Sequence, residues 1–233
     1  MSVLYLIRHG QASFGAADYD NLSPRGAEQA RALGRHLAAG PPPDAVYSGP
    51  RRRQLDTARH LVDAASAAGA AMPAPAVVEE LDEFPAFEIF RMCLPQITAA
   101  DADLAAELGS SDRAVQERAM GRAFDRVCRG WARGELDAGE HETFAGFCQR
   151  VGRGLERVRT EIGRGRRALV VTSGGPISVA VRSCLGLEGD ATLRLALVVA
   201  NASTTEVRWR DGELTLFGFN HTHYLDPDLL TYR

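Results

Sequence analysis

Long hydrophobic runs are missing from this sequence. No stretch reaches about 18 consecutive apolar residues, the length that a membrane-spanning helix needs. Residues 1–7 also lack the basic stretch, long apolar core and cleavage site of a secretory signal. We therefore expect a cytoplasmic protein that has no membrane partner.

An excess of positive charge is absent as well. The chain has 27 Lys and Arg residues against 30 Asp and Glu residues, which gives a formal net charge of -3. Proteins that bind nucleic acids usually carry a basic surplus. This balance argues against general nucleic-acid binding, and we expect no nucleic-acid partner.

Cysteine is scarce, with four residues in a chain of 233. The four lie far apart and form no C-x-x-C pair, which argues against zinc and thioredoxin-like sites. Buried or unpaired thiols, as in a reducing compartment, are expected for Cys93, Cys128, Cys148 and Cys184.

The remaining composition is typical of a soluble globular protein, with 45% apolar and 24% charged residues. In the first half, short apolar runs alternate with helical patterns. Continuous apolar runs suit strands buried on both faces, and Ser23-Pro24 offers an N-cap and a first-turn proline. The predicted strands are 3–7, 45–47 and 77–78, and the helices start at Ser23-Pro24 and cover 51 to about 68. This order implies βαβ units and a mostly parallel sheet.

The second half begins with a change of pattern. Residues 83 to about 140 are rich in Ala, Arg and acidic residues, which predicts an irregular loop followed by helices beside the sheet. The elements predicted after it are a helix over 143–162, a strand over 168–172 and a helix over 177–185. A hairpin of 203–209 with 214–219, which turns at Asp211-Gly212, comes last. We predict an α/β three-layer sandwich with a mostly parallel central sheet flanked by helices. The chain would form one domain, 1–233, with a helical cap insertion at about 83–140.

Arg8-His9-Gly10 follows directly after the first predicted strand. Ligands bind at this end of parallel strands, and a histidine there can be a base, a metal ligand, a nucleophile or an ordinary structural residue. The guanidinium of Arg8 suits phosphate oxygens, and its charge disfavours the imidazolium form of His9. The tripeptide alone leaves these roles open.

Three further segments carry groups that suit an anion site. Arginines 51–53 open a helix, residues 79–83 hold four carboxylates, and Thr172-Ser173-Gly174-Gly175-Pro176 leads a strand into a helix N-terminus. Clustered carboxylates raise one another's pKa, so that one could serve as a general acid. Each segment also has a plain interpretation: a solvated basic face, an acidic surface patch and a common Gly-Gly turn.

In this order and spacing, the four segments resemble the histidine phosphatase superfamily, also called the phosphoglycerate mutase-like family. Residues 22–30 match its L-[ST]-x-x-G-x-x-Q-A helix. His141-Glu142-Thr143-Phe144, followed by Arg150-Val151, resembles its G-E-S/T…R-V segment. The resemblance covers nearly the whole chain.

The resemblance implies a role for four residues of the site. His9 matches the histidine that accepts the phosphoryl group, and Arg8 matches the neighbouring arginine that binds phosphoryl oxygens. Arg53 matches the arginine of an S-x-x-x-x-R-x-x-x-T-A stretch anchored at Ser48 and Thr57-Ala58, which leaves Arg51 and Arg52 peripheral. Glu83 matches the general acid of an L-x-E pattern, with Glu80 as the alternative.

One position departs from the family's pattern. Members usually have V-[ST]-H-G-G after the late strand, whereas this chain has Ser173 before Gly174-Gly175. Ser173 can donate a hydrogen bond to the substrate or cap the following helix, and Gly174 offers a backbone donor. The family often has a histidine near the C-terminus, and His221 or His223 could compensate for Ser173. Losing one preorganised donor typically costs on the order of 10²–10³ in rate, which weakens an enzyme without abolishing it.

The resemblance predicts a phosphomonoester hydrolase that forms a phosphohistidine on His9 from a small phosphorylated substrate. The arginines would take the place of a cation, so neither a metal nor a cofactor is expected. Two alternatives stay open: mutase-type phosphoryl transfer, and a catalytically weak module that binds a phosphorylated ligand. The sequence names no substrate and leaves the oligomeric state open, with a homodimer as one option.

Overall fold

The computed structural model describes residues 1–13, 20–210 and 212–232, and within these ranges six strands form one mixed sheet. Their order is β3-β2-β4-β1-β5-β6. The bounds are β1 Ser2–Arg8, β2 Ala45–Ser48, β3 Ala76–Val77, β4 Arg167–Thr172, β5 Thr204–Arg210 and β6 Glu213–His221. The strands predicted from the sequence are all present.

The pairing of these strands confirms a mostly parallel sheet. β1 runs parallel to β4, β4 to β2, and β2 to β3, whereas β5 is antiparallel to both β1 and β6. The last pair is the predicted hairpin, although Asp211 of its turn lies outside the described residues. Part of the predicted loop after His9, residues 14–19, lies outside them too.

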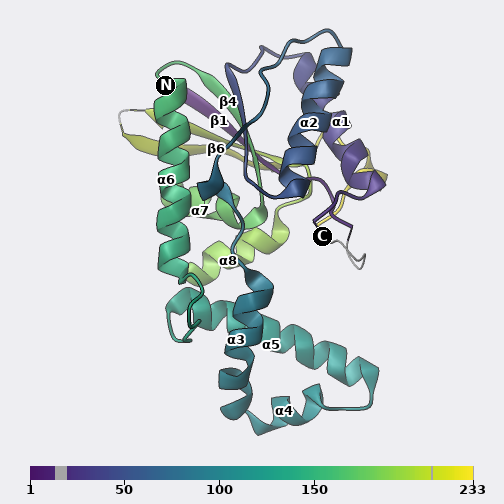
Figure 1. Cartoon of the computed structure of the whole chain (residues 1–233), viewed down its shortest axis with the longest axis vertical. Coiled ribbons are helices and arrows are strands. Elements are labelled where there is room, and N and C mark those ends of the chain that lie inside the picture. The colour runs from purple at the N-terminus through teal and green to yellow at the C-terminus, as the bar shows by residue number, and fades with distance from the viewer. Residues whose placement is uncertain (14–19, 211, 233) are drawn as a thin grey trace.

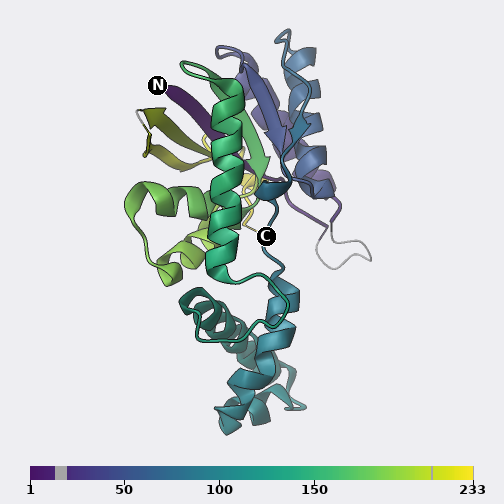
Figure 2. The same cartoon turned by 60° about the vertical axis from the view of Figure 1, so that its left-hand side comes forward.

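Helices cover both faces of the sheet, which gives the predicted three layers. α1 (Pro24–Ala38) and α2 (Arg52–Ala67) lie on one face, and α6 (Phe144–Ile162) and α7 (Gly174–Leu185) lie on the other (Figures 1 and 2). As predicted, Ser23 caps α1, because its hydroxyl accepts a hydrogen bond from the N–H of Gly26.

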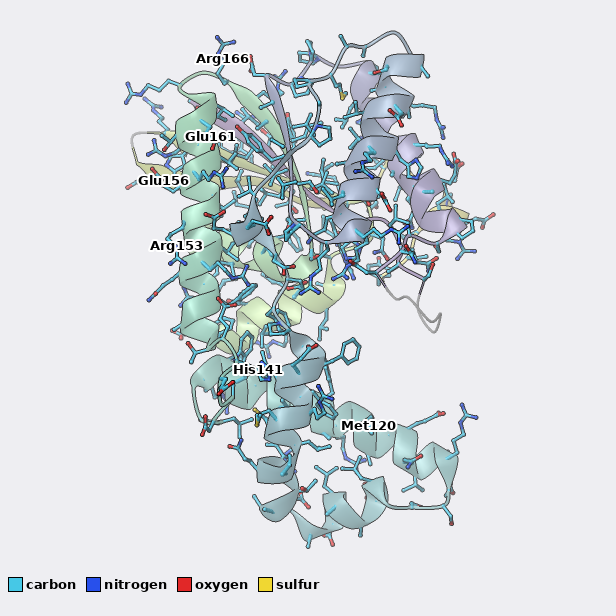
Figure 3. The ribbon with its side chains drawn as sticks, in the orientation of Figure 1. Met120, His141, Arg153, Glu156, Glu161 and Arg166 are labelled. Atoms are coloured by element: carbon cyan, nitrogen blue, oxygen red, sulfur yellow. The ribbon has the colours of Figure 1, made fainter. Side chains whose placement is uncertain are left out.

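Alternating side chains of the buried strands contribute to two hydrophobic cores. Ile7 and Val171 pack with Leu33 of α1 and Leu61 of α2 on one face. On the other face, Leu4, Leu6 and Val170 pack with the apolar stripe of α6, namely Phe147, Val151, Leu155 and Val158. Figure 3 shows Arg153 and Glu156 on the opposite, outward side of α6, as expected for an amphipathic helix.

The segment after β3 forms helices that project from the sheet. A short 3₁₀ helix, η1 (Glu79–Leu81), is followed by α3 (Ala86–Ala99), α4 (Ala102–Leu108) and α5 (Arg113–Arg133), which extend away from the sheet in both views (Figures 1 and 2). Residues 83–140, all of which are described, contain no strand. This agrees with the expected helices, while the assignment of 1–233 to one domain with an insertion stays a prediction.

One helix has no counterpart among the predicted elements. α8 (Gly189–Val198) packs against α7 and α5 and so connects the projecting helices to the sheet layer. α7 also begins at Gly174, three residues earlier than expected. The chain then ends in a second 3₁₀ helix, η2 (Pro227–Leu229), and an extended segment.

Two expectations about chain chemistry can be compared with the structure. All four cysteines are free, with Cys93 buried and the other three half-buried. Within the described residues, no helix has both the length and the apolar character required to cross a membrane.

Candidate active site

Three parallel strands end at the same edge of the sheet, and the candidate site is built there. Arg8 at the end of β1 lies opposite Thr172 at the end of β4. The N–H of His9 donates to the carbonyl of Thr172 at 2.8 Å, and the N–H of Gly49 donates to the carbonyl of Val171 at 2.9 Å. The residues that follow the three strands therefore meet, as the sequence predicts for parallel strands.

His9 is buried, with 5% of its surface exposed, and both of its ring nitrogens are engaged. Nδ1 lies 2.7 Å from the carbonyl oxygen of Gly10, which can only accept a hydrogen bond. Nε2 accepts a hydrogen bond from Nε of Arg53 at 3.1 Å. Together, these partners assign the neutral tautomer with its proton on Nδ1 and its lone pair on Nε2.

The environment also keeps His9 neutral. Burial lowers the pKa of the imidazole well below its usual range, and the charges of Arg53 and then Arg8 lower it further. The hydrogen bond to Gly10 acts in the opposite direction but does not compensate. The expected effect of Arg8 is therefore present, although burial is the larger cause. A neutral imidazole with its lone pair on Nε2 can act as a nucleophile or a base.

The backbone at His9 and Gly10 is fixed by groups from distant segments. Asn201 donates to the carbonyl of His9 at 3.1 Å, and the N–H of Ala202 donates to the same oxygen at 3.3 Å. The N–H of Gly10 donates to the hydroxyl of Thr57 at 3.0 Å. Ala202 has a φ of 54°, a left-handed conformation that costs a non-glycine residue on the order of 1–3 kcal/mol. The residue in this unfavourable conformation is thus one whose N–H contacts the backbone of His9.

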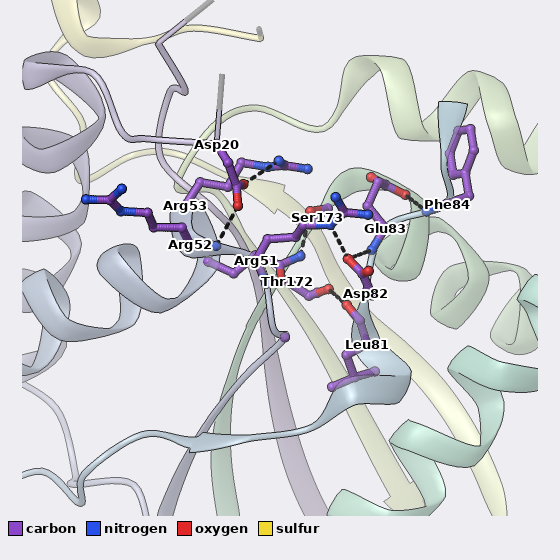
Figure 4. A network of polar contacts seen from close by, with 12 residues as sticks. Asp20, Arg51, Arg52, Arg53, Leu81, Asp82, Glu83, Phe84, Thr172 and Ser173 are labelled. Atoms are coloured by element: carbon purple, nitrogen blue, oxygen red, sulfur yellow. Dashed lines mark hydrogen bonds and ion pairs between the residues drawn. The ribbon is translucent and has the colours of Figure 1, made fainter. Parts of the chain in front are cut away.

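Among the three arginines that open α2, the structure directs Arg53 to His9. Arg53 is buried, and besides its contact with His9 its Nη1 lies 2.7 Å from a carboxylate oxygen of Asp20. Arg51 instead pairs with Asp82 at 2.6 Å, and the side chain of Arg52 is 62% exposed (Figure 4). Of the three arginines, Arg53 is therefore the one whose side chain contacts His9.

Arg8 approaches the site from the end of β1. Its guanidinium donates to the carbonyl oxygens of Val199 and, at 3.0 Å, of Tyr232. Its charge lowers the pKa values of both His9 and Glu83. The carbonyl groups of Val199 and Tyr232 therefore orient the arginine that the family resemblance assigns to binding phosphoryl oxygens.

Glu83 lies at the N-terminus of α7, where its two oxygens accept hydrogen bonds from the N–H groups of Phe84 and Gly175, each at 3.1 Å. A Cβ at Gly175 would lie 2.0 Å from Oε1 of Glu83, so a larger residue there would displace this carboxylate. Burial raises the pKa of Glu83 more than these hydrogen bonds and the nearby arginines lower it. The direction agrees with the sequence-based expectation, but the stated cause is wrong: burial, and not the clustered carboxylates, raises this pKa.

The loop that carries Glu83 is fixed by an arginine that sequence reasoning assigned only to a motif. Arg150 of α6 donates to the carbonyl oxygens of Glu80 at 2.9 Å and Asp82 at 3.0 Å, and pairs with Glu142 at 2.8 Å. Glu80, the alternative general acid, lies 3.4 Å from Arg157 on α6. The two arginines that act on the pKa of His9, Arg53 and Arg8, act on the pKa of Glu83 as well.

Ser173 is fully buried at the start of α7, directly after β4. Capping of α7, one of the two roles open to its side chain, is not observed, because that side chain makes no capping hydrogen bond. Its hydroxyl accepts a hydrogen bond from Nε2 of Gln54 at 2.7 Å instead. Gly174 follows at the first position of α7, where a Cβ would lie 2.6 Å from the carbonyl oxygen of Ala196.

His221 and His223 belong to a different part of the molecule. With His36 of α1 and Tyr5 of β1, they line a cavity of about 530 Å³. The rings of His36 and His223 are 5.0 Å apart, and His36 stacks on Tyr224 at 4.9 Å. The structure therefore groups these histidines with one another, and the suggestion that one of them compensates for Ser173 gains no support.

Residues 1–13, 20–210 and 212–232 contain no group of three or more His, Cys, Asp or Glu side chains that could bind a metal ion.

Comparison with known proteins adds a family and a fold. A model of the histidine phosphatase superfamily (branch 1) matches residues 4–121 and 106–222. Phosphoserine phosphatase from Entamoeba histolytica has a similar structure, with a TM-score of 0.65, 19% identity, and coverage of 97% of this chain and 100% of that one. The structure is also similar to alpha-ribazole phosphatase from Shigella flexneri, with a TM-score of 0.61, 20% identity, and coverage of 94% of this chain and 96% of that one. Phosphoglycerate mutase from Bacillus anthracis has a TM-score of 0.65, 19% identity, and coverage of 96% of this chain and 94% of that one. At these identities the structural likeness shows the fold alone.

Proposed function

Because this chain belongs to the histidine phosphatase superfamily (branch 1), we propose that it is a phosphomonoester hydrolase that forms a phosphohistidine on His9. The observation that carries the proposal is the pair of hydrogen bonds to the ring of His9. They leave the lone pair on Nε2, and Arg53, a donor suited to phosphoryl oxygens, lies 3.1 Å from that atom. A nucleophilic nitrogen and an anion-binding group therefore lie next to each other.

In the first step, Nε2 of His9 attacks phosphorus, so that the N–P bond forms as the bond to the substrate oxygen breaks. The hydrogen bond from Arg53 to Nε2 has to break first, and phosphoryl oxygens then accept from the guanidinium in competition with Asp20. Arg8 adds positive charge from the end of β1. Glu83, whose raised pKa favours the protonated form, donates its proton to the leaving oxygen.

In the second step, the ionised carboxylate of Glu83 accepts a proton from water while the water oxygen attacks phosphorus. The N–P bond breaks, inorganic phosphate leaves, and His9 returns to its neutral form. Splitting the reaction into two displacements is the benefit of a covalent intermediate. Phosphoryl transfer depends mainly on positioning and electrostatic stabilisation, which the two arginines supply.

The direct test is turnover of phenyl phosphate by the wild-type chain, measured as release of inorganic phosphate. Release that continues over many equivalents of protein is expected. Binding of inorganic phosphate without turnover would instead support the phosphate-binding module. Transfer of the phosphoryl group to an added alcohol or second phosphorylated compound, without release to water, would support the mutase.

Glu83→Gln is expected to lower kcat for an alkyl phosphate by about 10²–10⁴, the usual contribution of a general acid. The loss should be smaller for 4-nitrophenyl phosphate, because that leaving group departs without protonation. In the wild type, kcat/KM should fall as pH rises through the raised pKa of Glu83, since the acid form is lost. It should also fall on the acidic side, below the usual pKa of a histidine, where His9 becomes protonated.

The matched control for this prediction is Glu80→Gln, which changes a carboxylate three residues away that faces Arg157. This control should retain both limbs of the pH profile, whereas Glu83→Gln should lose the basic limb. If the basic limb survives in Glu83→Gln, another group is the acid and the assignment of Glu83 is wrong.

A further inference from the structure

The hydroxyl of Ser173 takes part in a short chain of hydrogen bonds whose direction is fixed. The backbone N–H of Arg51 donates to Oε1 of Gln54 at 3.0 Å, and Nε2 of Gln54 donates to Oγ of Ser173 at 2.7 Å. Because a backbone N–H can only donate, the end of the amide that faces Arg51 is the oxygen. The other end is the amino group, which can only donate, so the hydroxyl of Ser173 is the acceptor.

Packing leaves this arrangement no alternative. Gln54 and Ser173 are both fully buried, so the amide has no contact with solvent. A Cβ on Gly49 would lie 2.4 Å from Oε1 of Gln54 and 2.8 Å from the carbonyl oxygen of Leu81, which shows how closely the turn after β2 encloses the amide. The neighbouring Thr172 directs its own hydroxyl to the carbonyl of Leu81 at 2.7 Å.

Fixing the acceptor side of Ser173 determines what its proton can do. The hydroxyl proton of Ser173 must point away from Gln54. Ser173 also follows directly after Thr172, and the carbonyl of Thr172 accepts a hydrogen bond from the N–H of His9 at 2.8 Å. Ser173 thus lies at the strand edge that carries His9, with Arg53 and Glu83 in the same network of Figure 4. We propose that Gln54 is a positioning residue that turns the hydroxyl of Ser173 so that it donates to a phosphoryl oxygen bound over His9. This inference rests on the proposed function.

The test is a double-mutant cycle with Gln54→Met, Ser173→Ala and the double variant, measured as kcat/KM for phenyl phosphate. Methionine matches the length of glutamine but neither donates to Ser173 nor accepts from Arg51. Ser173→Ala should lower kcat/KM by about 10²-fold, as for other single preorganised donors. Gln54→Met should lower it at least about tenfold when Ser173 is present, and by less than about twofold when position 173 is alanine. Equal losses in both backgrounds would show that Gln54 acts through packing alone and would overturn the proposal.

Gln54→Glu provides a second variant that keeps the shape and the bond from Arg51. A carboxylate cannot donate to Ser173, so the hydroxyl should turn and donate to the carboxylate instead. In the Ser173→Ala background, the loss of kcat/KM caused by Gln54→Glu reports the effect of the new charge alone. Any additional loss of kcat/KM when Ser173 is present reports the reversed hydrogen bond. If Gln54→Met does not fold, as judged by circular dichroism, this pair decides the question, and no additional loss would overturn the proposal.

A readout without turnover separates this inference from the proposed function. Orthovanadate, an anion that resembles the transferring phosphoryl group in the transition state, can be titrated into the wild type and the three variants of the Gln54→Met cycle. Gln54→Met should weaken its binding at least about tenfold only where Ser173 is present. If the wild type binds orthovanadate with this pattern but does not hydrolyse phenyl phosphate, the proposed function fails and the role of Gln54 stands. If the wild type turns over and both readouts are additive, the role of Gln54 fails alone.

Discussion

With His9 replaced by asparagine, kcat for phenyl phosphate is expected to fall by about 10⁶, the size of the loss when a protease loses its nucleophile. Asparagine keeps a short N–H group that can reach the carbonyl of Gly10, but it has no atom equivalent to Nε2. Inorganic phosphate should still bind, with Kd changed by less than about tenfold, because the arginine donors remain. Steady-state phosphate release and calorimetric titration measure the two quantities.

The matched control is His60→Asn, which changes a half-buried histidine on the same helix as Arg53. It should leave kcat unchanged. If His9→Asn retains wild-type kcat, or if both variants lose activity alike, then His9 is not the nucleophile.

Arg53→Lys is the second substitution with a large expected effect. It should lower kcat/KM by about 10³–10⁵, the range seen for arginines that stabilise a transferring phosphoryl group. Lysine keeps the positive charge, but it lacks the planar fork that can contact Nε2 of His9 and a second acceptor together. The rate of phosphate release and the Kd of orthovanadate check this expectation.

Arg52→Lys is the control, since the side chain of Arg52 is mostly exposed and adjacent in sequence. It should change kcat/KM by less than about twofold, as for most surface substitutions. Comparable losses in the two variants would mean that α2 supplies charge without a specific contact, which contradicts the assigned role of Arg53.

The positions of the main site residues could be predicted from the sequence because strand ends and helix starts are local features. The apolar run before Arg8-His9-Gly10 indicated a buried strand, and parallel strands bring their carboxyl ends together. The anchors Ser48 and Thr57 selected Arg53 from three consecutive arginines, and the structure directs that residue to His9.

The hydrogen bonds between distant segments could not be predicted. Gln54 gives no signal in the sequence, because a glutamine on a helix is ordinarily exposed, and its burial depends on the turn at Gly49. Arg150 and Asn201 position Glu83 and His9 from elements far along the chain. Contacts of this kind follow from packing, which no local pattern reports.

Two local features differ from what the sequence suggested, for related reasons. Capping of α7 was one role open to the side chain of Ser173, but that side chain turns to Gln54, because a buried amide that lacks an acceptor costs more than an uncapped N–H. The raised pKa of Glu83 was attributed to neighbouring carboxylates, whereas burial causes it. In each case burial, which the sequence shows only indirectly, determines the outcome.

The central claim is that Nε2 of His9 becomes covalently phosphorylated. The measurement is mass spectrometry of the chain mixed with an excess of phenyl phosphate and quenched within milliseconds in alkali, where a phosphohistidine survives. The account predicts one added phosphoryl group, located on the peptide that contains His9, absent from His9→Asn and more abundant in Glu83→Gln if the second step is slowed. Continuing turnover with no phosphorylated chain, or a phosphoryl group on a residue other than His9, would contradict it.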